Sequence, residues 1–155
     1  MKPVTAEWVT KAEDDYAAAL HLSRKRKSSV PSIVCFHCQQ CAEKYLKALL
    51  VETNIRFPKT HDLLALLKLL SSVAPSLTPF YEKLEPLNGY AVEFRYPSES
   101  ATKEEAGIAL ANCRAVRKEI RKILGVGDPP SAQMNLRIKE RRVRYKVGRK
   151  KKARR

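Results

Sequence analysis

The spacing of the apolar residues is the feature that most constrains the fold of this chain. In several segments these residues recur every three or four positions, which is the period of an amphipathic helix. The segments are residues 5–24, 32–53, 62–72, 79–84 and about 100–124. No segment of useful length shows the alternation that indicates a strand. The sequence therefore predicts an all-α fold, an antiparallel up-and-down bundle of four to five helices.

Proline and serine residues indicate where these helices begin and end. Pro31 suits the first turn of the second helix. Pro58 disfavours helical geometry at Phe57, so the second helix should end before that point. We expect either Ser98 or Ser100 to cap the last helix.

The positive charge is concentrated at the C-terminal end. The chain has 155 residues and a formal net charge of +15. Residues 1–125 hold 19 Lys and Arg against 14 Asp and Glu, whereas residues 126–155 hold 12 against 2. A segment that basic, with few apolar residues, repels itself and does not form a core. We therefore expect a helical bundle over residues 1–125 and a flexible basic tail over residues 126–155.

The tail has a pattern that suits a nucleic-acid backbone. Basic and apolar residues alternate over residues 141–147, where basic side chains can contact phosphates and a tyrosine can stack on a base. The residues expected to do this are Arg141, Arg142, Arg144, Tyr145 and Lys146. A solubilising extension without a ligand is the alternative interpretation.

Two further features bear on location and cofactors. No apolar run approaches the roughly 20 residues that a membrane-spanning helix needs, and the first residues form no signal-peptide stretch. We expect a cytoplasmic protein without membrane association. Cys35, Cys38 and Cys41 lie three residues apart on one predicted helix, and thiolates so placed do not easily converge on a metal. We expect these cysteines to pack in the core, with no metal and no other cofactor.

The second helix carries a recognisable motif. Residues 36–50 read Phe-His-Cys-Gln-Gln-Cys-Ala-Glu-Lys-Tyr-Leu-Lys-Ala-Leu-Leu. This resembles the second helix of the HEPN domain (higher eukaryotes and prokaryotes nucleotide-binding), which typically reads F-x-x-Q-Q-A-A-E-K-x-L-K-A-L. Three further marks occur in the family's order and extend the resemblance over about residues 5–124. They are Trp8 with Ala12, Thr60-His61-Asp62-Leu63 and Arg95-Tyr96-Pro97.

The resemblance implies a helical bundle that often dimerises, so a homodimer is expected, and it implies two kinds of activity. Some members are metal-independent ribonucleases that act as toxins, and others bind nucleotides or pair with a minimal nucleotidyltransferase. The ribonucleases carry an Arg-x4–6-His motif near the start of the last helix. Arg95 stands at the arginine position, but residues 96–107 contain no histidine.

The missing histidine decides between these activities. We expect a protein that binds a nucleotide or RNA and acts as the non-catalytic partner of a minimal nucleotidyltransferase in a toxin–antitoxin-like pair. A metal-independent ribonuclease toxin is the first alternative. A protein-binding scaffold is the second, and it would expose an apolar patch in place of a basic groove.

His61 is a candidate for two roles. In a ribonuclease it would deprotonate a ribose 2′-hydroxyl while Arg95 or Arg56 stabilised the charge that develops on the phosphate. Arg56 and His61 match the Arg-x4-His spacing, although they lie between the second and third helices. Alternatively His61, with Thr60 and Asp62, anchors that loop and caps the third helix.

The other candidates for ligand binding lie on the second helix and before the last one. Gln40, Lys44 and Lys47 share one side of a helix, where the lysines can hold phosphates and the glutamine can contact a base or ribose. The alternative is a solvated face with a Glu43–Lys47 pair. Arg95 offers a bidentate fork for a phosphate. The expected ligand-binding residues are thus Arg95, Tyr96, Gln40, Lys44, Lys47 and His61.

Overall fold

The chain is helical throughout the part that the computed structural model describes, which is residues 1–25, 29–91 and 99–127. Five α-helices and two short 3-10 helices account for the regular structure, and none of these residues lies in a strand. This confirms the predicted all-α fold. The elements are α1 (Pro3–Ser23), α2 (Pro31–Glu52), α3 (Leu63–Leu70), η1 (Pro75–Phe80), α4 (Tyr81–Asn88), η2 (Gly89–Ala91) and α5 (Lys103–Ile123).

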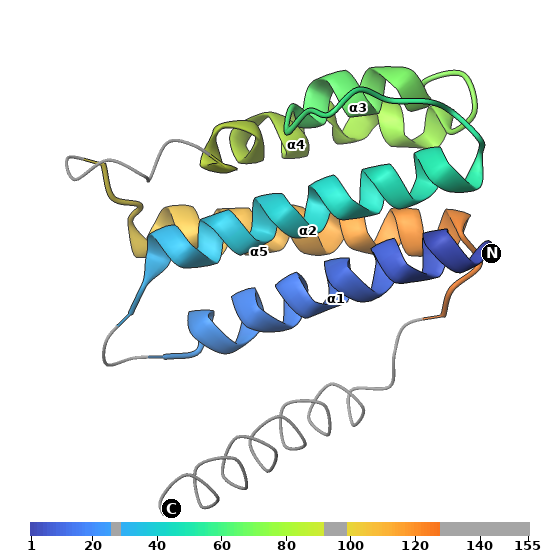
Figure 1. Ribbon diagram of the computed structural model, residues 1–155. Coiled ribbons are helices and arrows are strands. Elements are labelled where there is room, and N and C mark those ends of the chain that lie inside the picture. The colour runs from blue at the N-terminus through green and yellow to red at the C-terminus, as the bar shows by residue number, and fades with distance from the viewer. Residues whose placement is uncertain (26–28, 92–98, 128–155) are drawn as a thin grey trace, which may run out of the picture.

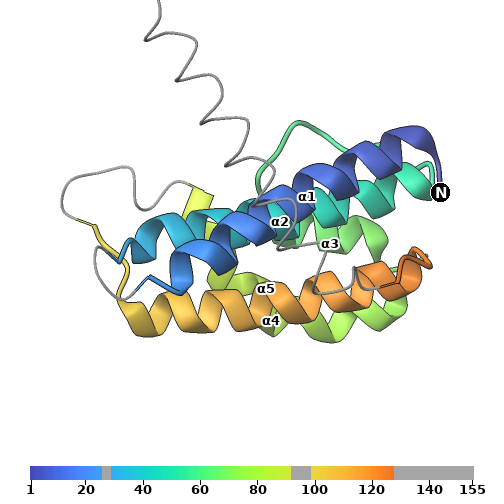
Figure 2. The ribbon, with the colours of Figure 1, turned by 90° about the horizontal axis from the view of Figure 1, so that it is seen from below.

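Helix α2 runs through the middle of the bundle (Figure 1). It packs against α1 on one side and α5 on the other, and the shorter helices α3 and α4 cover a third side. α1 and α2 are antiparallel, as are α3 and α4. Residues 53–62 cross back along the bundle, so that α3 runs in the same direction as α2 (Figure 1). The view in Figure 2 shows α1 and α5 on opposite sides of the molecule.

Burial follows this arrangement. Because α2 has neighbours on several sides, 13 of its 22 residues are buried. The four cysteines are reduced thiols in the core, as expected for packing residues. Contact with Cys38 and Cys41, together with burial, raises the pKa of the Cys113 thiol. No helix within residues 1–25, 29–91 and 99–127 combines the length and apolar character that crossing a membrane requires.

The start of α5 differs from the prediction. Its cap is Thr102 rather than Ser98 or Ser100. The Thr102 hydroxyl accepts from the Glu105 backbone N–H at 3.1 Å, and the Glu105 carboxylate accepts from the Thr102 N–H at 2.7 Å. This reciprocal capping box satisfies two backbone donors at once, which a single serine would not.

Helix α4 also differs, because the predicted helix over residues 79–84 is displaced. The observed helix begins at Tyr81 and continues through Pro86 to Asn88. A proline inside a helix removes one hydrogen bond and strains the preceding turn. The full burial of Leu84 and Leu87 offsets this cost, because both side chains lie in the core.

Candidate functional site

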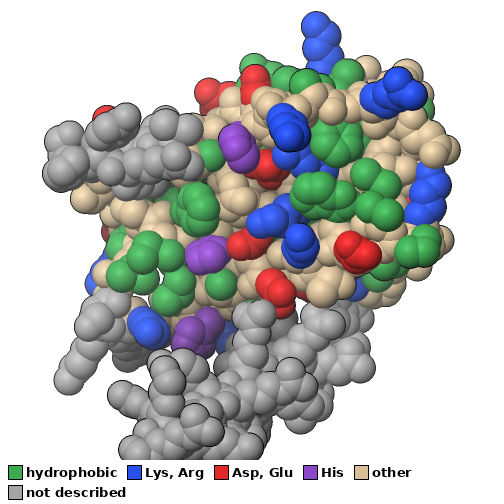
Figure 3. All heavy atoms as spheres, in the orientation of Figure 1, with side chains coloured by type: hydrophobic (Ala, Val, Ile, Leu, Met, Phe, Trp, Pro, Cys, Tyr) green, Lys and Arg blue, Asp and Glu red, His purple; other side chains and the backbone are tan. Residues whose placement is uncertain are grey.

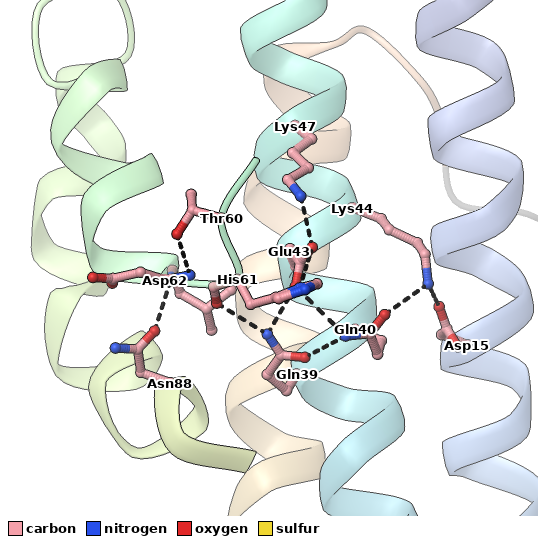
Figure 4. Close-up of polar contacts among 11 residues, drawn as sticks. Asp15, Gln39, Gln40, Glu43, Lys44, Lys47, Thr60, His61, Asp62 and Asn88 are labelled. Carbon is pink, nitrogen blue, oxygen red and sulfur yellow. Dashed lines mark hydrogen bonds and ion pairs between the residues drawn. The ribbon is translucent and has the colours of Figure 1, made fainter. Parts of the chain in front are cut away.

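A buried polar network runs along α2. The carboxylate of Glu43 accepts from Lys47 Nζ at 2.7 Å and from Gln39 Nε2 at 3.0 Å. The residues Gln39, Glu43 and Lys47 are all buried, and their spacing of four residues places them on one side of the helix. Figure 4 shows the three side chains stacked along α2. Burial of a charge is tolerated here because the opposite charge and a hydrogen-bond donor are both present.

The loop before α3 is fastened to this network by His61. The ring Nδ1 of His61 lies 3.1 Å from Glu43 Oε2, and the backbone carbonyl of His61 accepts from Gln39 Nε2 at 3.3 Å. An ionised carboxylate can only accept, so Nδ1 carries the proton. The histidine side chain is 69% exposed, against 5% for Glu43. The loop thus holds an imidazole at the surface with a fixed orientation (Figure 4).

The neighbours of His61 cap and position α3. The Asp62 carboxylate accepts from the backbone N–H groups of Leu64 and Ala65 at 2.9 and 3.1 Å. Asn88, at the end of α4, accepts from the Leu63 N–H at 2.6 Å. The Thr60 hydroxyl accepts from the Asp62 N–H at 3.1 Å. The capping interpretation therefore describes what the Thr60–Asp62 segment does, with Asp62 as the cap.

A second polar cluster joins α1 to α2. Asp15 accepts from Lys44 and lies 2.9 Å from His37 Nδ1. Lys44 also donates to Gln40 at 3.3 Å, and Gln40 donates to the Gln39 side chain at 2.7 Å. These bonds connect Asp15 on α1 to the network around Glu43 (Figure 4). On this face of the molecule, acidic, basic and histidine side chains are interleaved (Figure 3).

The two buried acids at the centres of these clusters stay ionised. Burial by itself raises the pKa of Glu43, but hydrogen bonds from Lys47, Gln39 and His61 outweigh it and hold the pKa below its ordinary value. For Asp15, burial is outweighed in the same way by His37 and Lys44, and its pKa is also lowered. Both carboxylates therefore remain negative at neutral pH and compensate the neighbouring cations.

The predicted residues are not all placed alike. Gln40, Lys44 and Lys47 lie together with His61, but each lysine ammonium is paired with an acid of the bundle. Lys47 is also flanked by aromatic rings, with Nζ 5.8 Å from the ring centre of Trp8 and 5.9 Å from that of Phe57. The lysine charges are thus compensated inside the protein.

The remaining predicted residues do not form a site with His61. Arg56 is exposed and forms no hydrogen bond or ion pair within the described part of the chain. Arg95 and Tyr96 lie outside the described residues, and so do the tail residues. The latter are Arg141, Arg142, Arg144, Tyr145 and Lys146. Within the described residues, no group of three or more His, Cys, Asp or Glu side chains is arranged to hold a metal.

A further cluster was not predicted from the sequence. Arg117 of α5 binds Glu13 of α1 through two bonds of 2.7 and 2.9 Å. Arg121 donates to the Tyr45 hydroxyl at 3.0 Å, and that hydroxyl donates to Glu13. Burial and the Glu13 charge raise the pKa of Tyr45, which keeps the phenol neutral. The cluster ties α1, α2 and α5 together, but no local signal marks it because its members are far apart in the sequence.

Comparison with solved structures supports the fold. TT1696 from Thermus thermophilus superposes with a TM-score of 0.62 at 22% identity, covering 76% of this chain and 96% of that protein. ST0689, an archaeal HEPN homologue, superposes with a TM-score of 0.56 at 22% identity, covering 79% and 98%. At this identity the likeness concerns the fold alone. No curated protein sequence matches this chain significantly.

The sequence comparison addresses the family directly. The profile of the HEPN domain matches residues 5–123, from α1 to the end of α5. This stretch contains the Glu43 network and the Thr60–Asp62 loop, which are the segments that resemble the family's motifs. The match covers most of the chain, and the chain therefore belongs to the HEPN domain family.

Proposed function

We propose that this protein is a non-catalytic HEPN module that binds a nucleotide or RNA and works beside a minimal nucleotidyltransferase. Family membership supports the broad assignment. The observation that carries the binding proposal is the exposed His61 imidazole, held by buried Glu43. Its Nε2 edge has no partner among the described residues and is available to a phosphate or a base.

The experiment is a calorimetric titration of the full chain. The ligands are the four ribonucleoside triphosphates and an oligouridine of about 12 nucleotides, a length within the range that single-strand-binding folds cover. We expect His61→Ala to weaken binding on the order of tenfold, equivalent to about 1.4 kcal/mol. The matched control is His21→Ala, which removes an exposed histidine at the end of α1. Equal affinity for the wild type and the His61 variant would refute the binding role.

The nucleotidyltransferase partnership needs its own test. The two purified proteins would be mixed and examined by size-exclusion chromatography with light scattering. A complex that elutes with the summed mass is expected. Separate elution over the micromolar range that transient interfaces occupy would remove this part of the proposal.

A ribonuclease is the second candidate, and one observation favours it. A carboxylate that holds the Nδ1–H of a histidine leaves Nε2 as the proton acceptor, which is the arrangement that general bases use. Glu43 and His61 have this arrangement. A candidate phosphate-stabilising group beside it is lacking among the described residues, since Arg56 has no contact with His61. The non-catalytic proposal is preferred for that reason.

A further inference from the structure

A groove lies on a different side of the bundle from the His61 site. It runs along the C-terminal half of α5 where η1 and α4 approach, and its volume is about 590 Å³. Phe80 and Val126 supply apolar lining, and Lys83, Lys118 and Lys122 supply positive charge. Figure 2 shows α4 and α5 side by side, with α1 on the opposite side of the molecule.

The lysines of this groove differ from those of the polar network. Lys83, Lys118 and Lys122 are exposed, and they form no hydrogen bond or ion pair with any residue of the described part. Lys44 and Lys47, by contrast, are each paired with a carboxylate. One acid, Glu119, lines the groove beside these three lysines and Arg121. The uncompensated positive charge of this region therefore faces the hollow.

The end of α5 directs the chain along this groove. Gly125 has a φ of +67°, a left-handed geometry that glycine adopts without strain. The Val126 N–H donates to the Arg121 carbonyl at 2.9 Å and the Gly125 N–H to the Lys122 carbonyl at 3.1 Å, which together form a Schellman motif. The Arg121 guanidinium donates to the carbonyl of Gly127. Gly127 is thereby fixed as a lining residue of the groove.

The sequence that follows Gly127 is the most basic part of the chain. Residues 128–155 contain 12 Lys and Arg and 2 Asp and Glu. The groove lysines and this segment are joined through a lining residue, so a polyanion held in the groove is within reach of the basic residues that follow. The C-terminus of a helix disfavours anions, and binding here must come from the lysine charges, which makes it sensitive to salt.

We propose that the groove between α4 and α5 is a phosphate-contacting site for single-stranded RNA, which continues from there along residues 128–155. The exposed lysines contact backbone phosphates, and the apolar lining at Phe80 accommodates a ribose or base face. This inference rests on the proposed nucleic-acid-binding function and assigns it a surface separate from the His61 site.

The test is fluorescence anisotropy of the full chain with labelled oligouridine of about 12 nucleotides at several salt concentrations. The groove variant combines Lys83→Gln, Lys118→Gln and Lys122→Gln. Each lost phosphate contact on a single strand lowers the slope of log affinity against log salt by about 0.7. We expect the slope to fall by about 2 and the affinity at low salt to fall at least tenfold.

The matched control removes the same charge elsewhere, with Lys11→Gln, Lys68→Gln and Lys103→Gln on exposed positions of α1, α3 and α5. It should bind RNA within about threefold of the wild type, because these positions do not line the groove. Equal losses in the groove and control variants would show an effect of net charge alone and overturn the site. An unchanged slope in the groove variant would also overturn it.

Two further arms fix the ligand and separate this inference from the proposed function. Polyglutamate of equal charge should displace the oligouridine far less well than unlabelled oligouridine does, and equal competition would overturn the RNA assignment. His61→Ala should leave the anisotropy slope unchanged if the groove binds the strand. Loss of RNA binding in that variant but not in the groove variant would place the strand at the His61 site and refute the groove.

Discussion

Among single residues, Glu43 has the most partners in the candidate site. It is buried, and it contacts a lysine and a glutamine of its own helix and the histidine of the following loop. A buried charge of this kind is stable only while its partners remain. Glu43 therefore both balances Lys47 and holds His61 at the surface.

Removal of Glu43 is expected to be costly. Glu43→Ala leaves the buried ammonium of Lys47 without its carboxylate, and breaking a buried pair costs roughly 3–5 kcal/mol of unfolding free energy. The measurement is urea unfolding followed by circular dichroism. Glu43→Gln with Lys47→Met removes both charges and should recover more than half of the loss. Glu85→Ala, at an exposed acid of α4, should leave stability unchanged, and an equal loss there would contradict the special role of Glu43.

Stability should also fall in acid. The pKa values of Glu43, Asp15 and Glu13 are lowered in the folded state, so the unfolded chain binds more protons when the pH falls. Their contribution is complete above the ordinary carboxyl pKa values of about 3.9 to 4.3, and it is lost as the pH drops toward the folded values. Thermal unfolding from pH 6 to about pH 3 should show a declining midpoint. A midpoint that rose in this range would contradict the assignment of these ion pairs.

Part of the residue-scale site was predictable and part was not. The spacing of Gln40, Glu43, Lys44 and Lys47 placed them on one side of a helix, because helix geometry is local. The contact of His61 with Glu43 joins residues 18 positions apart. It depends on how residues 53–62 cross the bundle, and no sequence period encodes that path.

At the scale of helices, the interiors followed the apolar period closely and the ends did not. The boundaries of α1 and α2 lie within two residues of those predicted, because long amphipathic patterns specify their own extent. The cap of α5 was missed because three residues within five positions can all cap a helix. Thr102 is chosen because Glu105 stands three residues later and completes the capping box.

The cap assignment gives a direct comparison of two variants. Thr102→Ala should lower the free energy of unfolding by about 1 kcal/mol, because the Glu105 N–H loses its acceptor. Ser100→Ala, at the position that the sequence suggested, should have no measurable effect. Chemical denaturation of the two variants tests this, and a larger loss for Ser100→Ala would contradict the structure.

At the scale of the whole molecule, the Glu13 cluster connects α1, α2 and α5. Arg117 and Glu13 are 104 residues apart in sequence, so only the assembled fold brings them together. The three-helix contact also positions the Tyr45 hydroxyl between Arg121 and Glu13. This cluster shows why the bundle could be predicted from periodicity while its internal polar contacts could not.

A double-mutant cycle tests that connection. Glu13→Gln and Arg117→Met should each destabilise the fold, and the double variant should lose less than their sum. Partners in one buried network typically show coupling of about 0.5–3 kcal/mol. Urea unfolding of the four proteins provides the values. Strict additivity would mean that the two side chains do not interact in solution.

The measurement that tests the proposed function most directly uses end-labelled RNA without metal, followed on a native and a denaturing gel. The wild-type protein is compared with the His61→Ala, Arg95→Ala double variant. We predict that the wild type retards the RNA on the native gel and leaves it intact on the denaturing gel. Cleavage by the wild type that disappears in the double variant would contradict the non-catalytic proposal and identify a ribonuclease.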